Sequence, residues 1–121
     1  MKLIIAGGRD FTDIDFMCER LDVLLRNTEE DPITIISGTA RGADQLGETY
    51  ARFRGYEVEH YPAQWDKYGR SAGYRRNELM ASVATHCVVF WDGQSRGSKH
   101  MIDLAKKQGL ELRIVLYGEA S

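Results

Sequence analysis

The sequence predicts one α/β domain, a Rossmannoid three-layer sandwich in which helices cover both faces of a five-stranded parallel sheet. Short apolar runs alternate with amphipathic segments along the 121 residues. Most of these runs are apolar, which is typical of strands buried on both faces. Residues 57–61 alternate instead and are expected to form a less buried strand. Each run is followed by a helical segment, which is typical of right-handed βαβ units. We therefore expect the strand order 3-2-1-4-5, with the switch point between the first and fourth strands.

The individual elements follow from local signals. Strands are expected over residues 2–6, 33–37, 57–61, 86–91 and 112–117. Helices are expected over residues 14–26, 42–54, 74–84 and 97–108. Thr12 or Asp13 can cap the first helix, and its apolar residues recur at helical spacing. In the second helix, Leu46, Tyr50 and Phe53 are expected to lie on one face.

Three segments are expected to be irregular. Residues 62–73 form the longest, and loops of this length in a small domain are often functional. The alternative is a surface loop whose Trp65 and Tyr68 only cover the core. A polar connection is expected over residues 27–32, and the tail from residue 118 is expected to fray.

Composition limits the class of protein. Hydrophobic residues make up 43% of the chain, charged residues 28%, and the formal net charge is −2. A dedicated nucleic-acid binder usually has a basic excess, so nucleic acid is not an expected partner. No apolar run is long enough to cross a membrane. Cys18 and Cys87 show no metal-binding spacing and are expected to be free thiols in a cytoplasmic protein.

Candidate ligand-binding residues cluster where strands end. The carboxyl ends of parallel strands meet at one edge of the sheet, so three glycine-containing loops should line one crevice there. Trp65, from the irregular segment, and Arg76 and Asn77, at the start of the third helix, are expected to join them. The predicted set is Gly7, Gly8, Arg9, Asp10, Ser37, Gly38, Ala40, Arg41, Gly42, Asp44, Trp65, Arg76, Asn77, Gly93, Ser95, Gly97 and Ser98.

The residue types in these loops suit a phosphorylated ligand that carries a ribose. Arg41 and Arg96 each precede a glycine that opens a helix, so each turn offers backbone N–H groups and a guanidinium. Asp10 or Asp44 can accept hydrogen bonds from ribose hydroxyls. Neither a P-loop nor the Gly-x-Gly-x-x-Gly fingerprint is present, which disfavours an NTPase and an ordinary NAD site. The alternatives are plain strand-to-helix turns and, around Arg76, a solvated basic face.

These motifs together resemble a known superfamily. Ser37-Gly-Thr-Ala-Arg-Gly-Ala-Asp44 is similar to the Ser-Gly-x-Ala-x-Gly-Ile/Ala-Asp motif of DNA-processing protein A. The segments around Gly7-Gly8-Arg9-Asp10-Phe11, Pro62-Ala-x-Trp65, Arg76-Asn77 and Phe90-Trp-x-Gly93 resemble the YspA-like branch of the SLOG superfamily. That superfamily also contains the Lonely-guy phosphoribohydrolases.

The resemblance implies a domain over residues 1–121 that binds a nucleotide or nucleotide-derived ligand as a sensor, sequestering or processing protein. It also implies a homodimer. Lonely-guy enzymes cleave the N-glycosidic bond of nucleoside monophosphates with a Glu, and Met101 occupies the matching position here. A thioether cannot act as a carboxylate, so no catalytic residue is assigned. Asp10, Asp44 and Glu48 are the carboxylates that could substitute.

The resulting hypotheses belong to three classes. The leading one is a nucleotide-ligand-binding domain without metal or cofactor. The alternative is a hydrolase or transferase acting at the N-glycosidic bond of nucleoside monophosphates. Single-stranded DNA binding ranks third, because the net charge is negative.

Overall fold

The computed structural model describes residues 1–26 and 32–118 of the chain. Its five-stranded sheet has the order β3-β2-β1-β4-β5, and all neighbouring strands are parallel. The predicted fold class and strand order are therefore confirmed. The switch point lies between β1 and β4, because the chain runs outward from β1 to β3 and then returns to place β4 on the other side.

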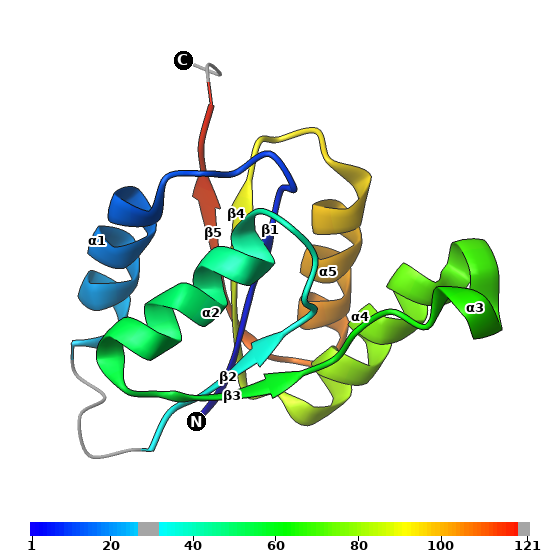
Figure 1. Cartoon of the computed structure of the whole chain (residues 1–121), viewed down its shortest axis with the longest axis horizontal. Coiled ribbons are helices and arrows are strands. Elements are labelled where there is room, and N and C mark those ends of the chain that lie inside the picture. The colour runs from blue at the N-terminus through cyan, green and yellow to red at the C-terminus, as the bar shows by residue number, and fades with distance from the viewer. Residues whose placement is uncertain (27–31, 119–121) are drawn as a thin grey trace.

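The helices and strands follow one another with short connections (Figure 1). The strands are β1 (Lys2–Gly7), β2 (Thr34–Ser37), β3 (Glu57–His60), β4 (His86–Trp91) and β5 (Glu111–Leu116). The helices are α1 (Ile14–Leu25), α2 (Ala43–Arg54), α3 (Trp65–Tyr68), α4 (Ala72–Val83) and α5 (Arg96–Lys107). The connection expected over 27–32 and the tail from 118 lie outside the described residues, apart from Pro32 and Gly118.

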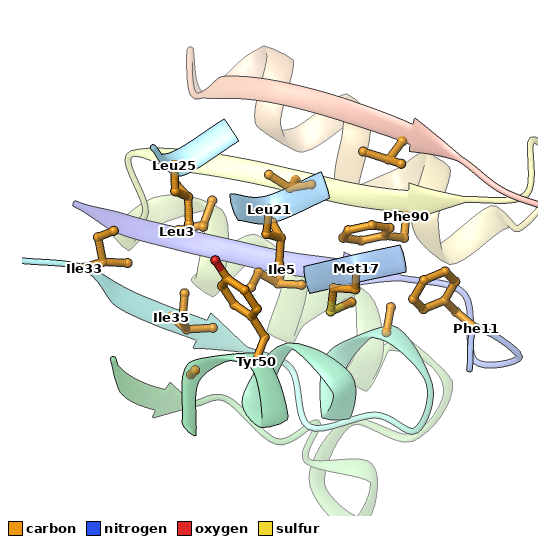
Figure 2. Packing of buried hydrophobic residues seen from close by; sticks show 14 residues of the cluster. Leu3, Ile5, Phe11, Met17, Leu21, Leu25, Ile33, Ile35, Tyr50 and Phe90 are labelled. Atoms are coloured by element: carbon orange, nitrogen blue, oxygen red, sulfur yellow. The ribbon is translucent and has the colours of Figure 1, made fainter. Parts of the chain in front are cut away.

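Helices cover both faces of the sheet, each over its own apolar cluster. On one face α1 lies over β1 and β4 and α2 lies on the β2 side, and their Met17, Leu21 and Tyr50 join a cluster with Leu3 and Ile5 (Figure 2). On the other face α4 and α5 supply residues such as Met80 and Met101. Successive residues of β1 alternate between the two clusters, as the two-residue period of a strand requires.

The segment over residues 62–73 differs from the prediction. It contains the short helix α3 and a 3-10 turn over Gly69–Ser71, and α4 already begins at Ala72. Each unit is three or four residues long, too short to show the apolar periodicity from which helices are recognised. Elsewhere the predicted boundaries differ by one or two residues, the usual uncertainty of helix and strand ends.

Phe53 shares a face of α2 with Leu46 and Tyr50, yet its side chain is 60% exposed. The buried face of α2 runs through Ala43, Gly47, Tyr50 and Ala51. At 100° per residue, Phe53 lies about 60° from Tyr50 on the side away from Gly47. Small residues therefore face the sheet, and a Cβ on Gly47 would already be 2.8 Å from Ile5 Cγ2.

Both cysteines are free, as predicted; Cys87 is buried and Cys18 is half-buried. Among the described residues, no helix is both long enough and apolar enough to cross a membrane.

Candidate functional site

The carboxyl ends of β1, β2 and β4 open onto one pocket of about 550 Å³. Its walls come from the loops after these three strands and from residues of α2, α3, α4 and α5. The predicted residues that line it are Gly7, Gly8, Arg9, Asp10, Ala40, Arg41, Asp44, Trp65, Arg76, Asn77, Ser95, Gly97 and Ser98. The structure thus brings most of the predicted set together, while their role in binding a ligand stays a prediction.

The loops after β1 and β2 are joined through their backbones. The carbonyl oxygen of Gly8 accepts hydrogen bonds from the N–H groups of Ala43 (3.1 Å) and Phe11 (3.3 Å). Gly42, at the start of α2, has a φ of 83°, and a Cβ there would collide with the Gly8 carbonyl. Only glycine satisfies both the positive φ and this close approach. The turn that places Arg41 and Asp44 therefore depends on Gly42.

Asp44 is the buried carboxylate of the site, with 7% of the residue exposed. Its Oδ2 accepts a hydrogen bond from Ala40 N–H at 3.2 Å. Burial raises its pKa from 3.8 to about 6, although the nearby positive charge of Arg76 and the Ala40 hydrogen bond oppose the shift. Asp44 can therefore exchange a proton near neutral pH.

Arg76 reaches across the pocket from α4 to the loop after β2. Its Nη1 donates to the carbonyl of Gly38, and its Nε donates to Asn77 Oδ1 at 2.9 Å. Burial lowers the pKa of this guanidinium, while the charge of Asp44 raises it. The Asn77 amide nitrogen lies 3.3 Å from His100 Nδ1, so both ends of this amide are engaged.

The loop after β4 presents the amino end of α5 to the pocket. Asp92 Oδ1 accepts hydrogen bonds from the N–H groups of Gln94 and Ser95, both at 2.8 Å, and these hold the Asp92 pKa below its ordinary value. Ser95 Oγ caps α5 by accepting from Ser98 N–H. The Ser98 hydroxyl is buried and has no hydrogen-bond partner among the described residues.

Three of the four arginines in the pocket have no hydrogen bond or ion pair from the described residues. They are Arg9, Arg41 and Arg70, which comes from the segment after α3, and all three are exposed. Asp10 differs, because its Oδ1 accepts a 2.6 Å hydrogen bond from the hydroxyl of Tyr117.

Several predicted residues support the pocket without lining it. Ser37 is buried, and its hydroxyl donates to Glu48 Oε2 at 2.6 Å. Gly42 lies behind the first loop, and Gly38 lines an adjoining pocket. Gly93 lies in a separate shallow hollow, and the Tyr68 ring is covered by the Arg75 guanidinium at 4.4 Å rather than facing the pocket.

Further lining residues were not in the predicted set. They are Ala6, Arg70, Gly73, Tyr74, Met80, Asp92 and Met101. Asp92 carried a usable signal, because an acid directly after a strand and before Gly is typical of a turn. Met80 and Met101 are core residues at helical spacing, and nothing in that spacing shows that they also reach a pocket. Among the described residues, no group of three or more potential metal ligands is present.

Comparison with known proteins shows the family. Residues 1–68 match the family described as YspA, cpYpsA-related SLOG. The chain belongs to this SLOG family. A relative is the Gene 61 protein of Mycobacterium phage D29, which is 30% identical over 115 residues, covering 90% of this chain and 91% of that protein.

Solved structures share the SLOG chain's fold. DNA processing protein A of Streptococcus pneumoniae matches with a TM-score of 0.72 at 17% identity, over 99% of this chain and 52% of that chain. DNA processing protein A of Helicobacter pylori, described as binding single-stranded DNA, matches with a TM-score of 0.65 at 18% identity, over 100% of this chain and 67% of that chain. The SLOG chain thus spans about half the length of the Streptococcus protein. Identities this low show the fold alone, so the expectation that nucleic acid is not a partner stays a prediction.

Proposed function

We propose that this SLOG domain binds a nucleotide-derived small molecule at the carboxyl edge of its sheet. The observation that carries the proposal is the convergence of Arg9, Arg41 and Arg76 on one pocket that also holds the buried carboxylate of Asp44. The guanidinium groups bind phosphate, Asp44 accepts from a ribose hydroxyl, and Trp65 covers a ring.

The charge arrangement favours an anionic ligand. Burial lowers the pKa of Arg76, and the positive charge of Arg9 lowers it further, because the two cations repel each other. A phosphate between them relieves this repulsion and forms charge-assisted hydrogen bonds. The amino end of α5 adds N–H groups that have no partner within the helix, and Ser98 adds an unpartnered hydroxyl.

The carboxylate and the aromatic ring supply the nucleoside contacts. The described residues provide a hydrogen bond to Oδ2 of Asp44 only, so Oδ1 remains available to a ribose hydroxyl. Trp65 is 51% exposed although it lines the pocket, and an indole left open to solvent offers a stacking surface for a base. We place this binding in the cytoplasm, where free thiols such as Cys87 persist.

Calorimetry with the four ribonucleoside 5′-monophosphates tests the proposal, using protein whose folding is checked by circular dichroism. Arg41→Ala should weaken binding by about 1.5–3 kcal/mol, roughly 10- to 150-fold, because it removes one charged hydrogen bond. Arg75→Ala is the matched control, since Arg75 lies over Tyr68 and outside the pocket. Absence of binding by folded protein, or equal binding by wild type and Arg41→Ala, would contradict the proposal.

A second candidate function is hydrolysis of the N-glycosidic bond. It is favoured by Asp44, the buried carboxylate with a pKa of about 6, because a general acid or base works best when its pKa lies near the working pH. Glu48 is held by Ser37 and lies 3.3 Å from His60, and Asp10 is held by Tyr117. Asp44 is therefore the carboxylate best placed to take the role of the Lonely-guy glutamate, whose position is occupied here by Met101. Release of free base from nucleoside monophosphates, lost in Asp44→Asn, would establish this activity.

A further inference from the structure

The pocket continues past Arg41 into a second compartment of similar size. This side compartment has a volume of about 570 Å³ and is lined by Arg9, Gly38, Thr39, Ala40, Arg41, Pro62, Ala63, Trp65 and Arg76. Five of these residues, namely Arg9, Ala40, Arg41, Trp65 and Arg76, also line the main compartment. The two compartments are therefore neighbours that share one wall.

The shared wall carries the positive charge. Three arginines, Arg9, Arg41 and Arg76, line both compartments, and so does Trp65. A phosphate held there would have one substituent directed into each compartment. A mononucleotide would fill one compartment and leave the other to water, since either volume alone lies within the range of a small-molecule site, about 300–1,000 Å³.

The outer walls of the side compartment suit a flat ring. Pro62 and Ala63 supply small apolar surfaces, and neither lines the main compartment. Thr39, on the opposite loop, adopts a φ of 65°, which is unfavourable for a β-branched residue. Its N–H is bonded to Ser37 Oγ at 3.1 Å, so the turn is held in this conformation before any ligand arrives. Such strain persists where the surrounding structure imposes it, often at ligand sites.

We propose that the ligand is a dinucleotide, in which two nucleosides are joined through a phosphate bridge. The bridge lies on Arg9, Arg41 and Arg76, one nucleoside occupies the main compartment, and the other lies against Pro62, Ala63 and Trp65. This inference rests on the proposed nucleotide binding and adds that the ligand has two halves.

The test compares each ribonucleoside 5′-monophosphate with its symmetrical dinucleoside diphosphate by calorimetry. A symmetrical ligand binds twofold more tightly on statistical grounds alone, because either half can enter first. If both compartments bind a nucleoside, we expect the affinity for the dinucleoside diphosphate to exceed that for the monophosphate by at least tenfold. Ala63→Trp fills the side compartment and should abolish the gain, so that the two ligand types bind this variant with similar affinity. Ala63→Ser, which adds little volume, is the matched control and should keep the gain. Gly73 lines the main compartment, and Gly73→Val, which adds a side chain against Trp65 and Arg76, should weaken both ligands.

Each outcome has one meaning. Equal affinity for both ligand types, or a gain that survives Ala63→Trp in folded protein, overturns the dinucleotide proposal and leaves nucleotide binding intact. If folded wild-type protein binds neither the monophosphates nor the dinucleoside diphosphates, the proposed function itself is overturned. A third arm uses a single-stranded DNA 20-mer. Tight binding of the 20-mer without any gain for the free dinucleotide would assign the side compartment to a nucleic-acid chain, which also overturns the proposal.

Discussion

Replacing Asp44 by Asn should stabilise the protein at neutral pH. Folding moves this carboxyl into a site where burial raises its pKa from 3.8 to about 6. An acid with a raised folded-state pKa favours folding in its protonated form, and that preference disappears as the pH rises from 3.8 through about 6. Asparagine resembles the protonated acid, and its amide oxygen can still accept the hydrogen bond from Ala40 N–H. The variant therefore avoids the cost of a buried negative charge.

The size of the effect follows from the two pKa values. At pH 7.5 the charged Asp44 lowers the free energy of unfolding by about 3 kcal/mol relative to the protonated form. At pH 5 the same calculation yields roughly half of this cost, because the folded protein is then mostly protonated at this site. The advantage of Asp44→Asn should thus fall by about half between pH 7.5 and pH 5.

Urea denaturation of the two proteins at these two pH values measures the effect. Asp103→Asn is the control, because Asp103 is exposed and paired with Lys99 at 2.6 Å, which lowers its pKa. That variant should not be stabilised at either pH. Two results would refute the view that Asp44 is a carboxylate destabilised by burial. One is that Asp44→Asn is no more stable than wild type at pH 7.5, and the other is that its gain in free energy of unfolding is the same at pH 5.

Three further changes test other parts of the site. Gly42→Ala should lower the free energy of unfolding by at least about 2 kcal/mol, because it combines a positive φ with a backbone collision. Gly55→Ala is the control, since Gly55 also has a positive φ but has open space around the added Cβ. It should lower the free energy of unfolding by less in the same urea titration. Ser98→Ala should leave stability unchanged or slightly higher, because it removes an unpartnered buried hydroxyl, while weakening nucleotide binding several-fold in calorimetry. The Ser37 hydroxyl accepts a hydrogen bond from Thr39 N–H, so Ser37→Ala should loosen the turn at Thr39 and reduce nucleotide affinity. A crystal structure of the variant would show the altered turn.

Much of the site was predictable because parallel strands bring their carboxyl ends to one edge. This rule alone places Gly8, Arg41 and Ser98, which are distant in sequence, around one pocket. The rule does not say which way a side chain points. Gly93 follows β4 as predicted, yet it lies in a separate hollow, since the turn held by Asp92 directs Ser95 and Ser98 to the pocket instead.

The burial of Asp44 could not be predicted from the sequence either. Its position in the first turn of α2 was evident, but its raised pKa arises from desolvation by the packed loops around it. Likewise, the contact of Arg76 with Gly38 joins residues 38 positions apart, and only the packing of α4 against the sheet brings them together.

The sequence by itself determined the architecture, because apolar runs, helical periodicity and glycine turns are local signals that consistently favour one parallel sheet. It also determined which residue types gather at the carboxyl edge. Tertiary structure decided which of these side chains line the pocket, how deeply Asp44 is buried and that a second compartment adjoins Arg41. Those properties depend on distances between segments that are far apart along the chain, and such distances are set only when the helices pack.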